Sequence, residues 1–349
     1  MTWAPRLSLV TGGSGFIGGH LVRMLAARGE RVRILDIHPP AQKLDGVSWI
    51  EGSICDAKSV REALEGAERL FHLAANPNLW ARDKSTFRQV NLEGTRTVLD
   101  EAGRAGTPRI IYCSTESILK SWRRNSATPI ANGDFDLGPD DMPGPYTISK
   151  LLAEREAIAA AARGLPVVIV NPTVPMGPGD RLLSPPTRML LNFLNGETPA
   201  YLDCAFNVVD VRHAAFAHIL AAERGRIGER YILGGVNVRL GDLLVTLGEV
   251  TGLRMPRYKV PYGIALAVAT VSEFIADRVT HRPPVAPLAG VRLARTPMLF
   301  DSSKAQLKLG MPETNLRRTL AEAVAWLVER GLVRRSVPNL AAMQLESAP

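Results

Sequence analysis

The sequence predicts an α/β fold in which helices wind on both sides of a parallel sheet, followed by a smaller mixed C-terminal lobe. Short apolar runs alternate with helical patterns from Leu7 to Val170, and strands that are apolar throughout belong to a sheet covered on both faces. A glycine-rich turn follows the first run, and proline and glycine become frequent after Asn171. We therefore expect a nucleotide-binding domain at residues 1–171, a substrate lobe with returns to the sheet at 172–335, and a flexible tail at 336–349.

The expected elements follow one another as short strands separated by helices. Residues 16–29 form a helical pattern that ends on a glycine, a residue suited to the position after a helix. Residues 56–66 form another, which begins at Asp56, a residue type that caps helices. The strand-like runs are at 7–10, 31–36, 47–52, 69–74, 109–114 and 166–170, with a later one at 229–235.

Composition limits the classes of protein to which the chain can belong. Its 349 residues are 46% hydrophobic, which supports a full globular core rather than disorder. The three cysteines are far apart, so we expect neither a disulfide framework nor a metal site. Basic residues are not interleaved with aromatic ones, which argues against a nucleic-acid partner. The chain enters the glycine turn almost at once, leaving no room for a signal peptide, and we expect a cytoplasmic protein.

The most apolar run is "VPYGIALAVATVS" at residues 260–272, which is too short to span a bilayer. We expect a buried helix here, with a helix lying on a membrane surface as the alternative. Residues 281–335 contain ten Arg/Lys against four Asp/Glu. This basic excess forms either a solvated surface or one that attracts anionic lipid head groups. Peripheral contact with the inner face of the membrane therefore stays open, as does a homodimer.

The glycine turn "VTGGSGFIGGHL" has the spacing of a dinucleotide-binding loop. Gly12 permits the tight turn, Gly15 lets a diphosphate approach the helix N-terminus, and Gly18 allows close packing of helix on strand. Asp36 ends the next strand. A carboxylate there accepts a hydrogen bond from a ribose 2′-hydroxyl and repels a 2′-phosphate, so the sequence favours NAD(H) over NADP(H).

The segment "GPYTISKLLAE" places Tyr146 and Lys150 four residues apart, on one face of a helix. Free tyrosine titrates near pH 10, and an ammonium group about 4 Å away would lower the pKa of the phenol. The phenol could then exchange a proton with a substrate oxygen. Ser114 ends the run at 109–114 and Thr115 follows it, and hydroxyl groups at the carboxyl end of a parallel strand face the ligand crevice.

Together these features resemble the extended short-chain dehydrogenase/reductase family, which includes the NAD-dependent epimerases and dehydratases. The matching segments extend over nearly the whole chain and include "TGGSGFIG", "FHLAA" (71–75), "NLEGT" (91–95), "YTISK" and "NPTVPMGPGD" (171–180). The resemblance implies a Rossmann-type fold with Thr115, Tyr146 and Lys150 as the catalytic residues. It implies a cofactor site formed by Gly12, Gly15, Phe16, Ile17, Gly18, Asp36, Ser53, Ile54, Leu73, Ala74, Ala75, Asn91, Tyr146, Lys150, Asn171, Thr173 and Val174.

Two positions depart from the family pattern. The aspartate that relatives carry near the adenine is Ser53 here, which can still accept one hydrogen bond. Nucleotide-sugar epimerases carry an arginine that grips the diphosphate, and the corresponding stretch "FNVVDVRH" has Phe206 in its place. Loss of a bidentate phosphate donor favours a substrate without a nucleotide diphosphate. Arg181, Arg188 or Arg212 could substitute for that donor.

Within the family, the front half is similar to 3β-hydroxysteroid dehydrogenases and sterol dehydrogenases, and the back half to hopanoid-associated sugar epimerases. The resemblance favours an NAD(H)-dependent oxidoreductase that interconverts a secondary alcohol and a ketone on a hydrophobic lipid of the sterol, hopanoid or keto-sphingolipid (ceramide) type. One alternative is a nucleotide-sugar epimerase or dehydratase that retains its NAD. The other is a non-catalytic dinucleotide-binding scaffold, which would be expected to have lost Tyr146 or Lys150.

Overall fold

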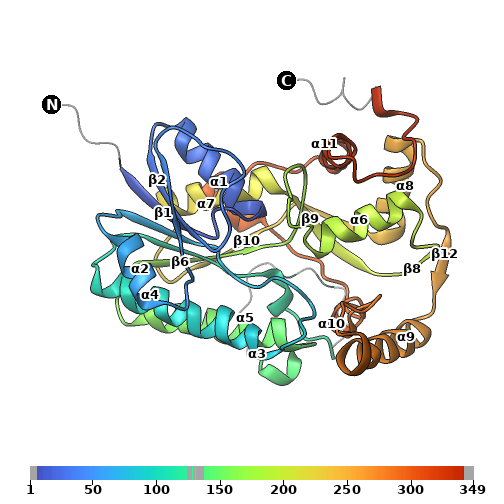
Figure 1. Ribbon diagram of the computed structural model, residues 1–349, viewed down its shortest axis with the longest axis horizontal. Helices are drawn as coiled ribbons and strands as arrows, with labels where there is room; N and C mark the ends of the chain where they lie inside the picture. The colour runs from blue at the N-terminus through green and yellow to red at the C-terminus, as the bar shows by residue number, and fades with distance from the viewer. Residues whose placement is uncertain (1–5, 124–127, 129, 131–136, 342–349) are drawn as a thin grey trace.

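A seven-stranded sheet dominates the computed structural model, which describes residues 6–123, 128, 130 and 137–341 (Figure 1). Its strands are β1 (Leu7–Thr11), β2 (Arg31–Asp36), β3 (Val47–Glu51), β4 (Arg69–His72), β5 (Ile110–Cys113), β6 (Val167–Pro172) and β10 (Arg230–Leu233). They lie in the order β3-β2-β1-β4-β5-β6-β10, and every pairing is parallel. From β1 the chain first adds β2 and β3 on one side, and it then crosses over to place β4 on the other side of β1. The predicted doubly wound Rossmann-type fold is therefore confirmed.

Helices cover both faces of this sheet (Figure 1). One face carries α1 (Phe16–Ala27) and α7 (Val211–Arg224), and the other carries α2 (Ala57–Leu64), α4 (Gly94–Arg104) and α5 (Pro145–Ala162). Successive side chains of a strand point to opposite faces. Val10 and Phe71 accordingly pack with α1 and α7, while Leu9 and Leu70 pack with the other three helices. Two apolar cores thus hold the sheet, which is why its strands are apolar throughout.

Local signals set the limits of the first helices. Gly29 follows the end of α1 with φ of 76°, a backbone conformation that glycine adopts without a steric penalty. Asp56 precedes α2, and its carboxylate accepts hydrogen bonds from the backbone N–H groups of Lys58 and Ser59 at 3.2 and 3.1 Å. Both helix ends agree with the sequence-based expectation.

The second lobe is a mixed assembly of small sheets and helices (Figure 1). A three-stranded sheet joins β7 (Val174–Met176), β9 (Ala205–Asp210) and β11 (Val236–Arg239), and a two-stranded sheet joins β8 (Ala200–Leu202) and β12 (Tyr258–Val260). The helices α6 (Pro185–Asn195), α8 (Leu240–Thr251) and α11 (Leu316–Glu329) contribute to its apolar core. β9 pairs in parallel with β7 and antiparallel with β11, which confirms the expected smaller mixed lobe.

The remaining elements complete the described chain. These are α3 (Ser85–Phe87), α9 (Tyr262–Ile275), α10 (Leu288–Leu293), π-helical turns at Arg88–Glu93, Ala276–Thr280 and Ala305–Leu309, and 3-10 turns at Glu116–Ile118 and Pro139–Asp141. Residues 342–349 of the expected tail at 336–349 lie outside the described residues. Among the residues that the structure describes, no helix is both long enough and apolar enough to cross a membrane.

The expectation of a buried helix at residues 260–272 is wrong. The segment lies in α9, and Ala269 is the only fully buried residue of that helix. Its apolar side chains point outward because the inward side carries Glu273, which binds Lys84. Apolar composition predicted the helix correctly but could not predict which side of it would face the protein.

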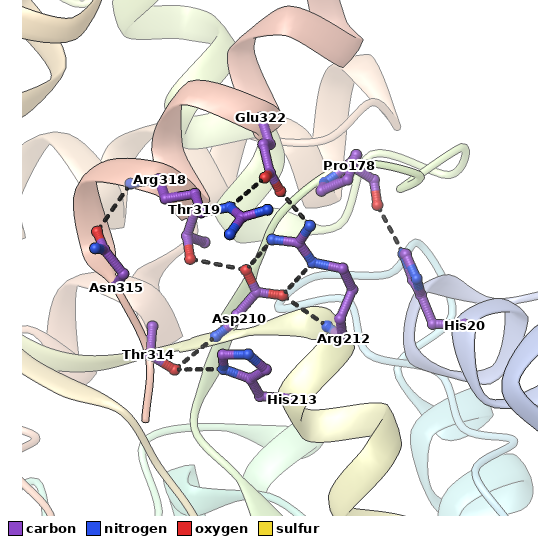
Figure 2. Close-up of polar contacts among 10 residues, drawn as sticks. All are labelled: His20, Pro178, Asp210, Arg212, His213, Thr314, Asn315, Arg318, Thr319 and Glu322. Carbon is purple, nitrogen blue, oxygen red and sulfur yellow. Dashed lines mark hydrogen bonds and ion pairs between the residues drawn. The ribbon is translucent and has the colours of Figure 1, made fainter. Parts of the chain in front are cut away.

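A polar cluster joins the N-terminus of α7 to α11 (Figure 2). The Asp210 carboxylate caps α7 by accepting from the Arg212 N–H at 2.8 Å. It also accepts two hydrogen bonds from the Arg212 guanidinium, at 2.8 and 2.6 Å, and one from the Thr319 hydroxyl at 2.8 Å. The same guanidinium reaches Glu322 on α11. Arg212 therefore connects the N-terminus of α7 to α11 of the second lobe.

Candidate active site

The glycine turn brings three stretches of backbone into close contact. Gly12 has φ of 71°, and a Cβ atom added there would lie 2.7 Å from the Ala74 backbone nitrogen after β4. A Cβ atom at Gly18 would lie 2.1 Å from the Gly12 carbonyl oxygen. In the described chain no side chain caps the N-terminus of α1, which begins at Phe16 after Gly15. The N–H groups of this first turn, including that of Ile17, are thus available to an anion such as a diphosphate.

Asp36 lies beside this turn. One carboxylate oxygen accepts a hydrogen bond from the Ser14 N–H at 3.0 Å, and the other accepts from the His38 N–H at 3.0 Å. Each carboxylate oxygen can accept more than one hydrogen bond. The residues present therefore fit a dinucleotide whose ribose hydroxyl group binds Asp36.

The segment after β3 contains Ser53 and Ile54, which are expected cofactor residues. The Ser53 hydroxyl accepts a hydrogen bond from the Cys55 N–H at 3.1 Å, so it stabilises its own turn. The Ile54 side chain is buried, and a Cβ atom at Gly94 would lie 2.7 Å from it. The Ser53 hydroxyl keeps its own proton to donate, so a cofactor contact through this side chain stays a prediction.

Asn91 clamps the loop that follows β4. Its Oδ1 accepts a hydrogen bond from the Asn76 N–H at 2.7 Å, and its Nδ2 donates to the Ser149 hydroxyl of α5 at 3.0 Å. The backbone of Leu73, Ala74 and Ala75 precedes this clamp and lies beside the glycine turn: the Leu73 N–H donates to the Thr11 carbonyl at 3.1 Å. Asn91 thus positions the loop along the cofactor crevice.

Three hydroxyl groups meet where β5 ends. The Thr115 and Ser117 oxygens are 2.9 Å apart, and the Tyr146 phenol hydrogen-bonds to both. Thr115 also donates to the Glu116 carboxylate at 2.9 Å. The structure therefore brings Thr115 and Tyr146 together as the sequence suggested. Ser117 was missed as a site residue, although its place two residues after Thr115 in the turn "STES" was a usable signal.

Lys150 does not act on Tyr146 in the way expected. Its ammonium group donates to the Cys113 carbonyl at 2.8 Å and to the Tyr112 hydroxyl at 3.2 Å. Burial raises the pKa of Tyr146 well above its usual range and lowers the pKa of Lys150. The expected lowering of the phenol pKa by Lys150 is therefore wrong for this structure, because burial is the largest influence and the ammonium group is turned to the end of β5.

Asn171 supports the catalytic strand end from β6. Its Nδ2 donates to the Thr115 carbonyl at 3.0 Å and to the Glu154 carboxylate at 2.7 Å. Its Oδ1 is buried and has no hydrogen-bond partner within the described part of the chain, so it can still accept a bond from a ligand. The Thr173 hydroxyl binds the Asn207 side chain at 2.8 Å, and the half-buried Val174 packs on the second-lobe core.

The carboxyl group of Glu116 should make the free energy of unfolding depend on pH. Burial raises its pKa from 4.5 to about 7. Because the folded state holds this proton more tightly, the stabilising contribution is complete below pH 4.5 and is lost as pH rises through 7. Relative to Glu116→Gln, the wild-type free energy of unfolding should fall by about 2 to 3 kcal/mol between pH 5 and pH 8 in urea titrations. Parallel pH profiles for the two proteins would contradict this assignment.

Comparison with known proteins identifies the family of the chain. The sequence pattern of the NAD dependent epimerase/dehydratase family matches residues 8–234. Sterol demethylase protein B of Methylococcus capsulatus is 34% identical over 330 residues, which cover 93% of this chain and 99% of that protein. A protein of Synechocystis sp. that is provisionally named dihydroflavonol 4-reductase is 35% identical over 332 residues, 93% of this chain and 95% of its own.

Solved structures agree with these sequence matches. The crystal structure of gox2253 has a TM-score of 0.80 and 34% identity, covering 94% of this chain and 99% of that chain. DesIV, a dTDP-glucose 4,6-dehydratase from Streptomyces venezuelae solved with NAD bound, has a TM-score of 0.75 and 26% identity over 94% of this chain and 99% of its own. The chain therefore belongs to the NAD-dependent epimerase/dehydratase family, within the extended short-chain dehydrogenases/reductases, and is an enzyme of that class.

Proposed function

We propose that the protein is an NAD(H)-dependent oxidoreductase that interconverts a secondary alcohol and a ketone on a hydrophobic lipid. One observation carries this proposal: Phe206 stands where a nucleotide-sugar epimerase would carry its diphosphate-binding arginine, and it packs with an apolar cluster next to the Thr115 turn. The apolar cluster begins at Ile118, directly after the catalytic turn, and includes Ile148 of α5. Most side chains of this cluster are buried core, and the half-buried Phe206 presents an apolar group where a diphosphate substrate would need a cation.

The residues of the site have distinct roles in this proposal. The nicotinamide, when bound, supplies or accepts the hydride. Tyr146 exchanges the proton with the substrate oxygen. The Thr115 hydroxyl turns its single proton from the Glu116 carboxylate to that oxygen and so orients it. The raised pKa of Tyr146 keeps the phenol protonated, as donation to a ketone oxygen requires. Lys150 anchors the end of β5 through the Cys113 carbonyl and would hold the cofactor ribose.

The arrangement of arginines supports a substrate without a nucleotide diphosphate. Phe206 replaces the arginine expected for such a substrate. Arg212, a nearby candidate substitute, binds Asp210 with two hydrogen bonds and also binds Glu322 (Figure 2). Freeing that guanidinium would leave the buried Asp210 carboxylate without its main partner, which is costly. The names of two relatives, sterol demethylase protein B and mouse sterol-4-alpha-carboxylate 3-dehydrogenase, agree with a sterol-like lipid.

Asp36 supports a preference for NAD(H). Its carboxylate is fixed beside the glycine turn by the Ser14 and His38 N–H groups. A 2′-phosphate placed next to it would experience charge repulsion. We further propose that the enzyme works at a membrane surface.

A substrate panel tests the proposed function. Keto-sterols, keto-sphingolipids and UDP-sugars are each incubated with NADH and with NADPH, and cofactor oxidation and products are measured. We expect turnover of the keto-lipids, with kcat/KM at least about tenfold higher for NADH than for NADPH because of the charge at Asp36. Turnover confined to UDP-sugars would contradict the lipid assignment, and equal use of both cofactors would contradict the role of Asp36.

A further inference from the structure

The helix α9 and the turn after it form an amphipathic segment whose apolar side faces outward. The side chains of Val271, Phe274 and Val279 are 59%, 62% and 69% exposed. Ile264 and Val268 extend the same stripe by one and two turns and are also largely exposed. These positions recur at helical spacing. We call these five residues the α9 face.

Polar contacts fix this outward orientation. The Lys84 ammonium group binds Glu273 at 3.2 Å and Asp277 at 2.5 Å. The Trp80 indole N–H donates to Asp277 at 2.8 Å, and the Leu288 N–H donates to Glu273 at 2.9 Å. Rotating the helix to bury its apolar side would break all four contacts. The exposed apolar stripe is thus held in place by the fold.

The surroundings of the α9 face are strongly basic. Residues 254–295 contain seven Arg/Lys and two Asp/Glu, and the two acids are the inward-facing Glu273 and Asp277. Arg278 and Arg282 are exposed at the C-terminal end of the segment, and Arg257 is exposed just before β12. Lys259 of β12 is also exposed, and its ammonium group binds the Asp203 carboxylate at 2.9 Å. An apolar stripe bordered by cations complements an anionic lipid surface.

The α9 face also lies close to the catalytic residues. The Phe87 ring packs edge-on against the Tyr146 ring, with centroids 6.4 Å apart. Phe87 and Trp80 line a small cavity, about 60 Å³, together with Pro145 of α5 and Glu273 of α9. Figure 1 shows α9 and α10 at the margin of the molecule, on the side where α3 and the start of α5 lie. Phe87 therefore lies between the inner side of α9 and the ring of Tyr146.

We propose that the α9 face docks on an anionic bilayer surface. Its apolar side chains enter the interfacial layer, and Arg257, Arg278 and Arg282 contact lipid phosphates. A second copy of the chain is a less suitable occupant, because pairing two such faces would bring like charges together. The purpose of docking, access of a lipid substrate to Tyr146, rests on the proposed function, whereas the docking itself does not.

Flotation with vesicles tests this surface without substrate or cofactor. Wild type is compared with Val271→Ser/Phe274→Ser on vesicles of phosphatidylcholine alone and with one third phosphatidylglycerol. We expect wild type to bind the anionic vesicles, and the double variant to bind at least about tenfold more weakly. Val245→Ser/Leu307→Ser is the matched control, since it removes two exposed apolar side chains elsewhere, and it should bind like wild type. Arg278→Gln/Arg282→Gln should lose about tenfold or more at low salt.

The outcomes separate docking from catalysis. Turnover of a water-soluble ketone without vesicles should be the same in all variants, because none of the changed residues lies in the catalytic cluster. Failure to find any ketone turnover would overturn the proposed function and leave the vesicle result valid. Equal flotation of wild type and Val271→Ser/Phe274→Ser would overturn the docking proposal. The docking proposal would also be overturned by a second result. In that result wild type does not float, and sedimentation shows a wild-type dimer that is absent in Val271→Ser/Phe274→Ser.

Discussion

Replacing Tyr146 by phenylalanine should lower kcat for ketone reduction about 1,000-fold, the range expected for loss of a positioned proton donor. The substitution removes only the hydroxyl group that bonds to Thr115 and Ser117. The ring can keep its edge-on contact with Phe87, so the fold and the cofactor crevice should persist. NADH affinity, measured by fluorescence titration, should change by less than about tenfold, because the substitution removes at most one of the implied cofactor contacts, that of the Tyr146 hydroxyl.

Tyr231→Phe provides the control for this experiment. Tyr231 is a buried tyrosine of β10 whose hydroxyl bonds to Glu229 and to the Arg226 N–H, away from the catalytic turn. Its substitution should leave kcat unchanged. A Tyr146→Phe enzyme that keeps wild-type kcat, or a Tyr231→Phe enzyme that loses it equally, would rule out the proposed proton transfer through Tyr146.

The largest effect on stability is expected for Gly18→Ala. The added methyl group would lie 2.1 Å from the Gly12 carbonyl oxygen and 2.9 Å from the Gly12 carbonyl carbon. Both are backbone atoms of the glycine turn, which cannot move without separating α1 from β1. We expect a loss of about 3 kcal/mol in the free energy of unfolding, measured by urea denaturation. NAD(H) binding should weaken in parallel, because the same turn forms the diphosphate site.

The neighbouring Gly19→Ala change separates this steric effect from helix propensity. A Cβ atom at Gly19 meets its nearest neighbour, the Gly13 carbonyl oxygen, at 3.8 Å, which is an ordinary contact. Alanine is also the better helix former, so Gly19→Ala should be neutral or stabilise the protein by up to about 1 kcal/mol. Similar destabilisation by both substitutions would show that crowding at Gly18 is not the cause.

The parts of the fold that the sequence predicts well are those with local physical causes. The glycine turn between strand and helix requires glycine at positions 12 and 18 for steric reasons. Burial of both faces of the sheet requires strands that are apolar throughout. Asp36 and Tyr146 follow such elements at fixed distances along the chain. Their places in the site could therefore be inferred before the three-dimensional arrangement was known.

Predictions that depended on side-chain direction were less successful. The four-residue spacing placed Lys150 on the same helix face as Tyr146, but its ammonium group bonds to the Cys113 carbonyl. The polar groups of Asn91, an expected cofactor residue, bind Asn76 and Ser149, so its place at the cofactor stays a prediction. The outward side of α9 depends on Lys84, which lies far away in sequence. Each of these outcomes depends on long-range partners that no local pattern encodes.

The position of β10 has a consequence for how the chain folds. β10 pairs with β6 at the end of the large sheet, yet most of the second lobe's strands and α6 and α7 lie between them in sequence. A chain that has been synthesised only as far as β6 therefore carries an unpaired strand edge, the kind of surface that promotes aggregation. The nucleotide-binding sheet is completed only after α7 has been made, and such distant pairing slows folding. The two lobes are consequently expected to fold as one cooperative unit, so that cutting between them would leave neither intact.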